Sequence, residues 1–539
     1  MADFSALSEL RNQQRPTRRN DKTYGKKKAP SAESRAMHFD LFGGRDENSV
    51  PSKQIVSEDV LEKANETEKL TIANHARDTP VPPVPFLSEP TFSVKEIPTE
   101  HNPRLRGRRK PASQKKMAAL TPEKLQRLNP LLKIVEQDGV KDFQEFGRSL
   151  GKTYLCTKLG EGSYADVYEL QAKDPDEAQR LEKRGGLIIK VIPFDVTGTS
   201  NDDIADLDSI TREIQLFQTV DALHGFVRCR GAHILSGEYP DVLFEAFSNF
   251  KDTHTADSAQ NIDPRNTASK YKPLYAILEM NHAGTSLGKL GQNGVASAFQ
   301  AFDIFWKTAI SLAHAEREVQ FEHRDLHNAN VCYKSLSKDG QLDVEQEVVE
   351  DMKEKPAVIL GLSNLEVTII DYTLSRATVG GNVIFDPMEY WDHEYKEDPR
   401  ESAGEERQYK TYAAVRELLI SAEAEAMAFA ELEGSSYKPI NKYERFVPKS
   451  NVLWLRYLLA EVLARGGGGG RGGCLPGSSR AAKKLQVEMW ETLEEVFAYL
   501  NGTTAGLLPA SADDFVGTAV EKGWLAEGDV VAYKAQVEE

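Results

Sequence analysis

The stretch HRDLHNAN, from His323 to Asn330, decides the fold. It fits the pattern H-R-D-x-x-x-x-N, in which the aspartate accepts the proton of an acceptor hydroxyl and the asparagine holds a metal ion. Asp325 and Asn330 stand at the required separation, with the histidine and arginine in place. The alternative is a capped turn after a helix, and the other motifs of the chain argue against it. The stretch predicts a phosphotransfer loop.

A lysine interrupts an apolar segment upstream of this loop. Lys190 lies within LIIKVIPF (187–194), which predicts a buried strand. A lysine inside such a strand is costly unless it is paired, and Glu213 follows on a predicted helix over 203–222. The alternative is an edge-strand lysine whose ammonium group reaches water. Paired with Glu213, Lys190 is predicted to attract the α- and β-phosphates of ATP.

A glycine-rich segment precedes both residues. LGEGSYADVYEL (159–170) predicts a strand, a tight turn and a second strand. Glycines let a backbone turn approach a polyphosphate closely, although they also serve ordinary turns. The residues of this segment that we predict to bind the nucleotide are Gly160, Glu161, Gly162, Ser163 and Val167.

A carboxylate ends another apolar strand downstream. Asp371 closes the run VTIID, and Mg²⁺ prefers one or two protein carboxylates together with phosphate oxygens. We therefore predict that Asn330 and Asp371 bind the metal. By analogy with the kinase fold, adenine would hydrogen-bond to the backbone of Glu279 to Asn281, after the strand YAIL (275–278).

The order of these motifs predicts the chemistry. A glycine turn, a strand lysine, a helix glutamate, an Asp–Asn loop and a strand-end aspartate together indicate phosphoryl transfer from Mg-ATP. Asp325, Lys190 and Glu213 are the predicted catalytic residues. In this chemistry the protein mainly positions groups and neutralises charge.

Strand patterns dominate the first half of the ordered chain, and helix patterns dominate the second. This arrangement predicts the α+β class and a two-lobed protein-kinase fold. We expect a disordered basic tail over 1–120, an N-lobe with insertions over 121–282 and a C-lobe over 283–539, with a glycine-rich loop at 465–480. The predicted helices of the C-lobe cover 295–318, 407–430, 449–465 and 481–500.

The charge is unevenly distributed. The 539 residues carry a net charge of −16, yet residues 1–120 hold 22 basic and 16 acidic residues. The body is thus strongly acidic, which disfavours direct binding to DNA phosphates and suits a basic peptide. The basic clusters RPTRR (15–19) and RLRGRRK (104–110) favour contact with an importin or DNA; the alternative is a solvated tail.

Other function classes are excluded by composition. No stretch approaches about 18 consecutive apolar residues, so we expect no membrane span, and the N-terminus lacks the apolar run of a secretory signal. The four cysteines are Cys156, Cys229, Cys332 and Cys474, without paired spacing. They predict a reducing compartment and neither a disulfide scaffold nor a cysteine-based zinc site.

Several departures from the usual kinase pattern point to one family. Asp371-Tyr372-Thr373 stands in place of Asp-Phe-Gly, Ala165 replaces the third glycine, and Ala-Pro-Glu does not occur. IIDYTLSR (369–376), the HRDLH run and SNVLWLRYLL (450–459) resemble the haspin family of atypical histone kinases. The chain looks like a fungal-type member.

The resemblance implies a substrate and a location. Haspins phosphorylate a threonine near the N-terminus of histone H3 in mitosis, so it implies ATP and Mg²⁺ as cofactors, chromatin as partner, and the nucleus and chromosomes as location. It also implies activity without activation-loop phosphorylation. Thr373 in place of a flexible glycine fits this, because it removes one route for flipping Asp371 out of the site. We expect a monomer regulated through its tail.

Acidic residues after the Asp-Tyr-Thr motif are candidates for binding the basic histone tail. They are Asp386, Glu389, Asp392 and Glu394. The alternative is a solvated acidic loop.

Two other functions stay open from the sequence. Small-molecule kinases of the aminoglycoside or choline kinase type share the Asp–Asn loop, although they usually have glycine where Arg324 stands. A chromatin-associated pseudokinase scaffold is the second, and the presence of all the chemical residues argues against it.

Overall fold

The computed structural model describes residues 120–162, 164–197, 204–254, 262–290, 295–336, 358–388, 403–466, 479–502 and 508–535. These residues belong to one compact unit. The predicted tail, apart from Leu120, and most of the predicted glycine-rich loop lie outside the described residues. No helix in the described ranges has the length and apolar character needed to cross a membrane.

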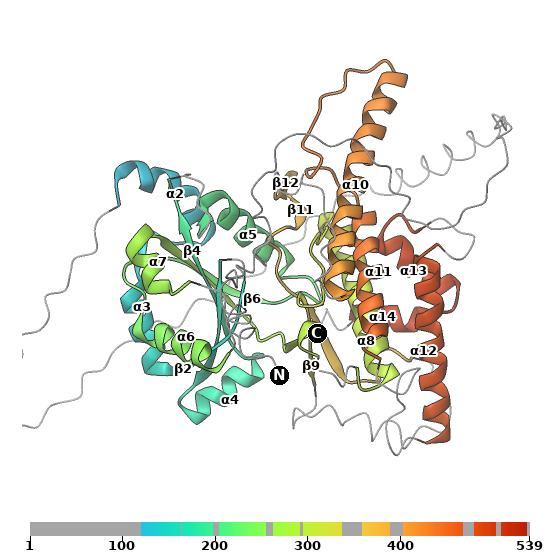
Figure 1. Ribbon diagram of the computed structural model, residues 1–539, viewed down its shortest axis with the longest axis horizontal. Helices are drawn as coiled ribbons and strands as arrows, with labels where there is room; N and C mark the ends of the chain where they lie inside the picture. Colours follow the sequence, from blue (N-terminus) through green and yellow to red (C-terminus); the bar gives the residue numbers. More distant parts are fainter. Residues whose placement is uncertain are drawn as a thin grey trace, which may run out of the picture. The chain divides into compact units, whose positions relative to one another are not determined.

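A mixed sheet lies in the N-terminal part of this unit (Figure 1). Its strand order is β1-β6-β7-β4-β3-β2, and β5 pairs with β4. The β1–β6 and β4–β5 pairs are parallel, and the other neighbours are antiparallel. Its strands are β1 (Lys141–Asp142), β2 (Tyr154–Glu161), β3 (Asp166–Ala172), β4 (Ile188–Asp195), β5 (Ala205–Asp206), β6 (Cys229–Ser236) and β7 (Leu274–Met280).

Helix α5 (Leu207–Val220) packs beside this sheet (Figure 1). It begins where the Asp206 carboxylate accepts a hydrogen bond from the Ser209 amide at 2.7 Å, which satisfies one free N–H of the first turn. Ile210, Ile214 and Phe217 are buried at helical spacing. The other helices here are α2 (Pro122–Ile134), α3 (Phe143–Thr153), α4 (Pro175–Lys183), α6 (Asp241–Thr253) and α7 (Pro264–Tyr271).

Helix α8 (Ala298–Val319) is the central element of the C-terminal part, and its apolar residues up to Ala315, including Phe302 and Trp306, are buried. It ends at Gln320, whose left-handed backbone (φ 49°) turns the chain into the Asp–Asn loop. Helices α11, α12 and α13 pack against it. The helices that follow are α10 (Ala403–Leu432), α11 (Lys449–Ala464), α12 (Arg480–Leu500), α13 (Ala512–Glu521) and α14 (Glu527–Ala535).

Two small sheets carry the ends of the functional motifs. The first has the order β10-β9-β8 and the second is the β11–β12 hairpin. Their strands are β8 (Thr285–Ser286), β9 (Val331–Ser335), β10 (Leu365–Ile369), β11 (Arg376–Val379) and β12 (Asn382–Phe385), and a short 3-10 helix covers Leu287–Lys289. The strand-rich first part and helical second part agree with the predicted α+β class.

Candidate active site

The lysine of β4 is paired with the glutamate of α5. Lys190 Nζ donates to Glu213 Oε1 at 2.6 Å and lies 3.4 Å from Asp371 Oδ1. Burial by itself would lower the pKa of Lys190, but the Asp371 and Glu213 carboxylates outweigh it and raise this pKa above its ordinary value. Lys190 is therefore a fixed cation between two anions, each from a different element.

The two predicted metal ligands meet at the end of one ladder. Strands β9 and β10 are antiparallel with Val331 opposite Ile369, so Asn330 and Ile370 extend the pair, and the Ile370 amide donates to the Asn330 carbonyl at 3.0 Å. Asp371 is the next residue. The antiparallel register thus places the backbone positions of Asn330 and Asp371 at the same end of the ladder, although 41 residues of chain separate them.

These residues fit Mg²⁺. The Asn330 amide group donates through Nδ2 to the Asp325 carbonyl at 2.8 Å, which leaves its oxygen as the end that can bind a cation. Amide and carboxylate oxygens are ligands that Mg²⁺ accepts beside phosphate oxygens and water. Within the described ranges no group of three His, Cys, Asp or Glu residues could hold a metal. Beside Asn330 and Asp371, phosphate oxygens and water would complete the coordination.

Asp371 is held in its position by its own motif. Its backbone is left-handed (φ 64°), a conformation that costs a non-glycine residue about 1–2 kcal/mol. Thr373 Oγ1 donates to Asp371 Oδ1 at 2.6 Å. Burial would raise the pKa of Asp371, but Lys190 and the Thr373 donors outweigh it and hold this pKa at about 2. Asp371 is therefore ionised at every physiological pH.

Tyr372, at the position of the usual phenylalanine, is locked into the core. Its hydroxyl donates to the Ile369 carbonyl at 2.8 Å and accepts from the Val227 amide at 3.1 Å. Its ring lies 6.4 Å from the Phe217 ring of α5 and 6.2 Å from the His323 ring. The Asp-Tyr-Thr motif thus connects α5 to the Asp–Asn loop.

His323 supports the same region as a neutral ring. Its Nε2 lies 3.1 Å from the Ile370 carbonyl, and its Nδ1 accepts from the Asp325 amide at 3.3 Å, which assigns the proton to Nε2. Burial lowers the pKa of His323 to about 4. This histidine therefore positions backbone and does not exchange protons near pH 7.

Asp325 is enclosed by donors. Asn330 Nδ2 lies 3.3 Å from Asp325 Oδ2, and the Tyr412 hydroxyl of α10 donates to Asp325 Oδ1. Burial raises the pKa of Asp325 well above its ordinary value, although both donors oppose the shift. A carboxylate with a raised pKa accepts a proton more readily, as a catalytic base must. No sequence motif marked Tyr412.

Arg324 is fully buried and has a partner within the same loop. It donates to Glu322 Oε1 at 2.9 Å and to the carbonyls of Tyr443 and Arg445 at 2.6 and 3.1 Å. Glu322 in turn accepts from the Ser450 hydroxyl at 2.6 Å. The described hydrogen bonds of Arg324 go to Glu322 and to two backbone carbonyls, and the sequence did not indicate Glu322.

The glycine-rich turn is anchored by a buried lysine that sequence analysis also missed. Lys158 Nζ lies 2.6 Å from Glu161 Oε1 and 2.7 Å from Asp166 Oδ1, and it sits 4.1 Å from the centre of the Phe247 ring on α6. The Gly162 amide donates to the Ala165 carbonyl at 2.8 Å, which closes the turn. The only sequence signal was a lysine in a strand pattern just before the glycines.

The remaining predicted nucleotide residues surround this turn. Gly160 is the second-last residue of β2 and pairs with Val167 on β3, and Val167 lies directly opposite Lys190 on β4. The register places the glycine turn over the lysine. Ser163 lies outside the described residues.

The predicted adenine segment begins within β7, which contains Glu279, and continues past the end of the strand to Asn281. Glu279 Oε1 lies 3.2 Å from His233 Nε2, and the Asn281 side chain accepts from Arg230 Nε at 2.7 Å. The amides of Asn281 and His282 donate to the Arg228 and Gly185 carbonyls. Adenine would therefore have to bind other backbone groups of this segment.

Of the predicted substrate-binding residues, the structure describes Asp386. It is buried, pairs with Arg212 of α5 at 3.0 Å and accepts from the Met388 amide at 2.8 Å. These partners give Asp386 a local role in fixing the segment after β12, and its contact with a peptide stays a prediction. Glu389, Asp392 and Glu394 lie outside the described residues.

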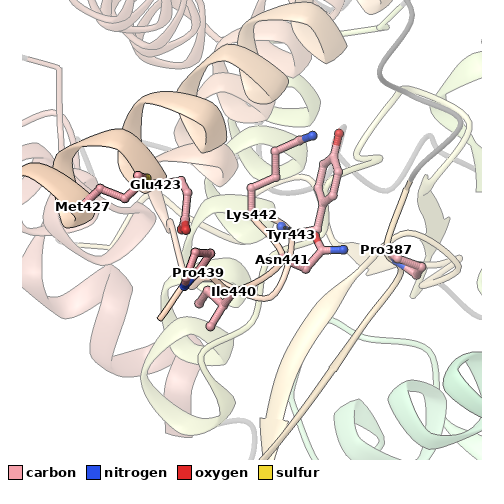
Figure 2. Close-up of a pocket in the computed structure, with 8 residues that line it drawn as sticks. All are labelled: Pro387, Glu423, Met427, Pro439, Ile440, Asn441, Lys442 and Tyr443. Carbon is pink, nitrogen blue, oxygen red and sulfur yellow. Dashed lines mark hydrogen bonds between the residues drawn. The ribbon is translucent and has the colours of Figure 1, made fainter. Parts of the chain in front are cut away.

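A surface hollow of about 380 Å³ adjoins this segment. Figure 2 shows Glu423 and Met427 of α10 beside Pro439 and Ile440, with Pro387 across from them. The Glu423 carboxylate accepts from Arg445 at 2.8 Å. None of the described nucleotide-site residues lines this hollow, so we assign it no part in nucleotide binding.

Comparison with known proteins identifies the domain. A family model described as "Haspin like kinase domain" matches residues 90–467. The Serine/threonine-protein kinase haspin homolog hrk1 of Schizosaccharomyces pombe is 26% identical over 351 residues, which are 63% of this chain and 61% of that protein. The haspin homolog of Drosophila melanogaster is 25% identical (57% and 48%), and the haspin of Mus musculus is 26% identical (58% and 36%). The match thus spans less than two thirds of each of these relatives.

Proposed function

The chain belongs to the haspin-like kinase family, and on this premise we propose that it is an ATP-dependent serine/threonine protein kinase that phosphorylates a threonine near the N-terminus of histone H3 in mitosis. The convergence of Lys190, Asp325, Asn330 and Asp371 carries the proposal. These are the groups that phosphoryl transfer requires at one place.

Each residue has a chemical task in the proposed reaction. Lys190, held by Glu213, draws on the α- and β-phosphates, and Asn330 and Asp371 hold Mg²⁺. When bound, Mg²⁺ neutralises the charge that develops on the phosphate oxygens. Asp325 accepts the proton of the threonine hydroxyl and orients the oxygen for attack on the γ-phosphate, whose bond to the bridging oxygen breaks as ADP leaves.

The sealed environment of Arg324 supports activity without phosphorylation. In many kinases a phosphorylated residue orders the activation loop by pairing with arginine. Here Arg324 already forms an ion pair with the Glu322 carboxylate, and both side chains are fully buried. We propose that the catalytic loop is assembled constitutively.

The choice of a histone tail rests on the family and on charge. The net charge of −16 belongs to a chain whose first 120 residues are net basic, so the catalytic body is strongly acidic. Such a body attracts a basic peptide and speeds its association. We further propose a nuclear, chromosome-associated protein whose basic N-terminal tail contacts DNA or an importin.

A peptide assay tests this function. The full chain is incubated with ATP, Mg²⁺ and a histone H3 N-terminal peptide, and in parallel with a threonine-to-alanine peptide, choline and an aminoglycoside. We expect phosphate on the wild-type peptide alone, and its loss in the Asp325→Asn variant, where removal of one aligned group costs about 2.7–4 kcal/mol in the barrier. Phosphorylation of a small molecule instead would contradict the proposal.

A further inference from the structure

We propose that Tyr412 is a positioning residue for the catalytic base, an inference that rests on the proposed kinase function. Its hydroxyl donates to Asp325 Oδ1 although 87 residues separate the two in the chain. Tyr412 belongs to α10, outside every motif that predicted the site. The hydroxyl therefore reaches the reacting carboxylate from an element that the motifs do not include.

The Tyr412 ring is fixed from two sides. Its centre lies 4.9 Å from that of Trp454 on α11, with the planes at 76°, and the side chain is buried. Gln408, one turn earlier on α10, lies with its Nε2 3.3 Å from the Tyr412 hydroxyl oxygen. Because that oxygen accepts from Gln408, its own proton is directed to Asp325.

Tyr412 and Asn330 hold different oxygens of the same carboxylate. Tyr412 donates to Oδ1, and Asn330 Nδ2 lies 3.3 Å from Oδ2. A carboxylate with a donor on each oxygen has one preferred orientation, and each oxygen keeps a second lone pair for a substrate hydroxyl. Removal of the Tyr412 donor would let the Asp325 side chain rotate away from the acceptor.

An alternative is that Tyr412 blocks the place of the substrate hydroxyl until the substrate binds, and this role predicts different effects of its removal. If Tyr412 occupied the place of the substrate hydroxyl and had to leave it, its removal would tighten peptide binding and open Asp325 to water. The packing against Trp454 and the position of Tyr412 within a continuous helix favour a permanent contact. We therefore expect turnover to suffer and peptide binding to stay the same.

The test compares Tyr412→Phe with Tyr409→Phe in the full chain, using the histone H3 peptide and ATP. Tyr409 lies one turn away on the same helix, with ring centres 6.4 Å apart. For Tyr412→Phe we expect kcat to fall about 10- to 100-fold, as for loss of a hydrogen bond to a charged group, with the peptide KM and thermal unfolding unchanged. Tyr409→Phe should behave as wild type. An unchanged kcat, or a lower peptide KM with faster ATP hydrolysis, would overturn the proposal.

A double-variant cycle separates positioning from a general structural effect. In an Asp325→Asn background, Tyr412→Phe should reduce the residual rate by less than about twofold, because the two residues act as one unit. A full multiplicative loss in that background would contradict the proposal.

ATP hydrolysis measured without peptide distinguishes failure of the proposed kinase substrate from failure of the positioning role. A wild type that hydrolyses ATP but ignores the peptide contradicts the proposed substrate, whereas equal hydrolysis by wild type and Tyr412→Phe contradicts the positioning role.

Discussion

Two ion pairs hold the two halves of the catalytic centre, and they differ in access to solvent. Lys190 and Glu213 are 2.6 Å apart with side chains 13% and 10% exposed, and Lys190 also reaches Asp371. Arg324 and Glu322 are 2.9 Å apart and both are 0% exposed. The first pair joins a strand to a helix at the edge of the nucleotide site, and the second lies wholly inside the catalytic loop.

The difference indicates different tasks. A cation that stays partly accessible can exchange partners with phosphate oxygens, so Lys190 serves the ligand. A cation whose donors go to Glu322 and to the carbonyls of Tyr443 and Arg445 has its partners inside the fold, so Arg324 serves the loop conformation. The left-handed backbone of Arg324 (φ 60°) is held by these contacts.

Breaking the fully buried Glu322–Arg324 pair should have the largest effect on stability. We expect Glu322→Gln to lower the free energy of unfolding by about 3–5 kcal/mol, because it leaves a buried, uncompensated arginine. Glu213→Gln is the matched variant of the accessible pair, and it should cost much less stability while it strongly reduces activity. Denaturant unfolding of both variants measures the contrast. Equal stability losses would show that solvent access does not distinguish the pairs.

The sealed region should also make stability depend on pH. His323 has a pKa lowered by burial from 6.5 to about 4, so the folded state favours its neutral form. This contribution is present above pH 6.5 and is lost as the pH falls towards 4, by about 3 kcal/mol in total.

Unfolding measured between pH 7 and pH 4 tests this dependence, with His323→Phe compared with replacement of the exposed His254. His323→Phe should roughly halve the slope of that part of the pH profile, because burial also lowers the pKa of His327 to about 4, and the His254 variant should follow wild type. A wild-type slope that survives in His323→Phe would assign the pH dependence to other groups.

A smaller effect is expected from the glycine-rich turn, which lies on the nucleotide side of the site together with the Lys190–Glu213 pair. Lys158 is shared between Glu161 and Asp166, and we expect Glu161→Gln to loosen the turn and to raise the KM for ATP about fivefold to tenfold, roughly the value of one hydrogen bond. Glu169→Gln, farther along β3, is the control and should leave the KM unchanged. Steady-state kinetics at varied ATP provides the measurement. An unchanged KM in Glu161→Gln would show that the anchor does not govern nucleotide binding.

The sequence predicted the parts of the site that follow from local pattern. The apolar strand around Lys190 and the helix that carries Glu213 were predicted from periodicity, and these two residues are indeed paired. The ladder that joins Asn330 to Asp371 follows the predicted strand at VTIID. Motif order sufficed here because Lys190 and Glu213 lie within regular elements, and Asn330 and Asp371 flank the ends of β9 and β10.

Other features of the site depend on contacts between residues far apart in the chain, which no local sequence pattern indicates. The helix containing Tyr412 was predicted, but periodicity does not say which residue of α10 turns towards Asp325. Asp386 was predicted from its charge and its place after the Asp-Tyr-Thr motif, and neither reveals a partner such as Arg212, 174 residues away. Glu322 likewise precedes the recognised motif, and only the fold shows that it neutralises Arg324.

The proposal that the catalytic centre is assembled by the fold alone is tested most directly by kcat/KM of the dephosphorylated protein. The full chain, treated with phosphatase and repurified, is compared with untreated protein for kcat/KM on the histone H3 peptide. Because Glu322 already neutralises Arg324, we predict values that agree within about twofold. A tenfold or greater loss after treatment, restored by rephosphorylation, would contradict a catalytic centre assembled by the fold alone.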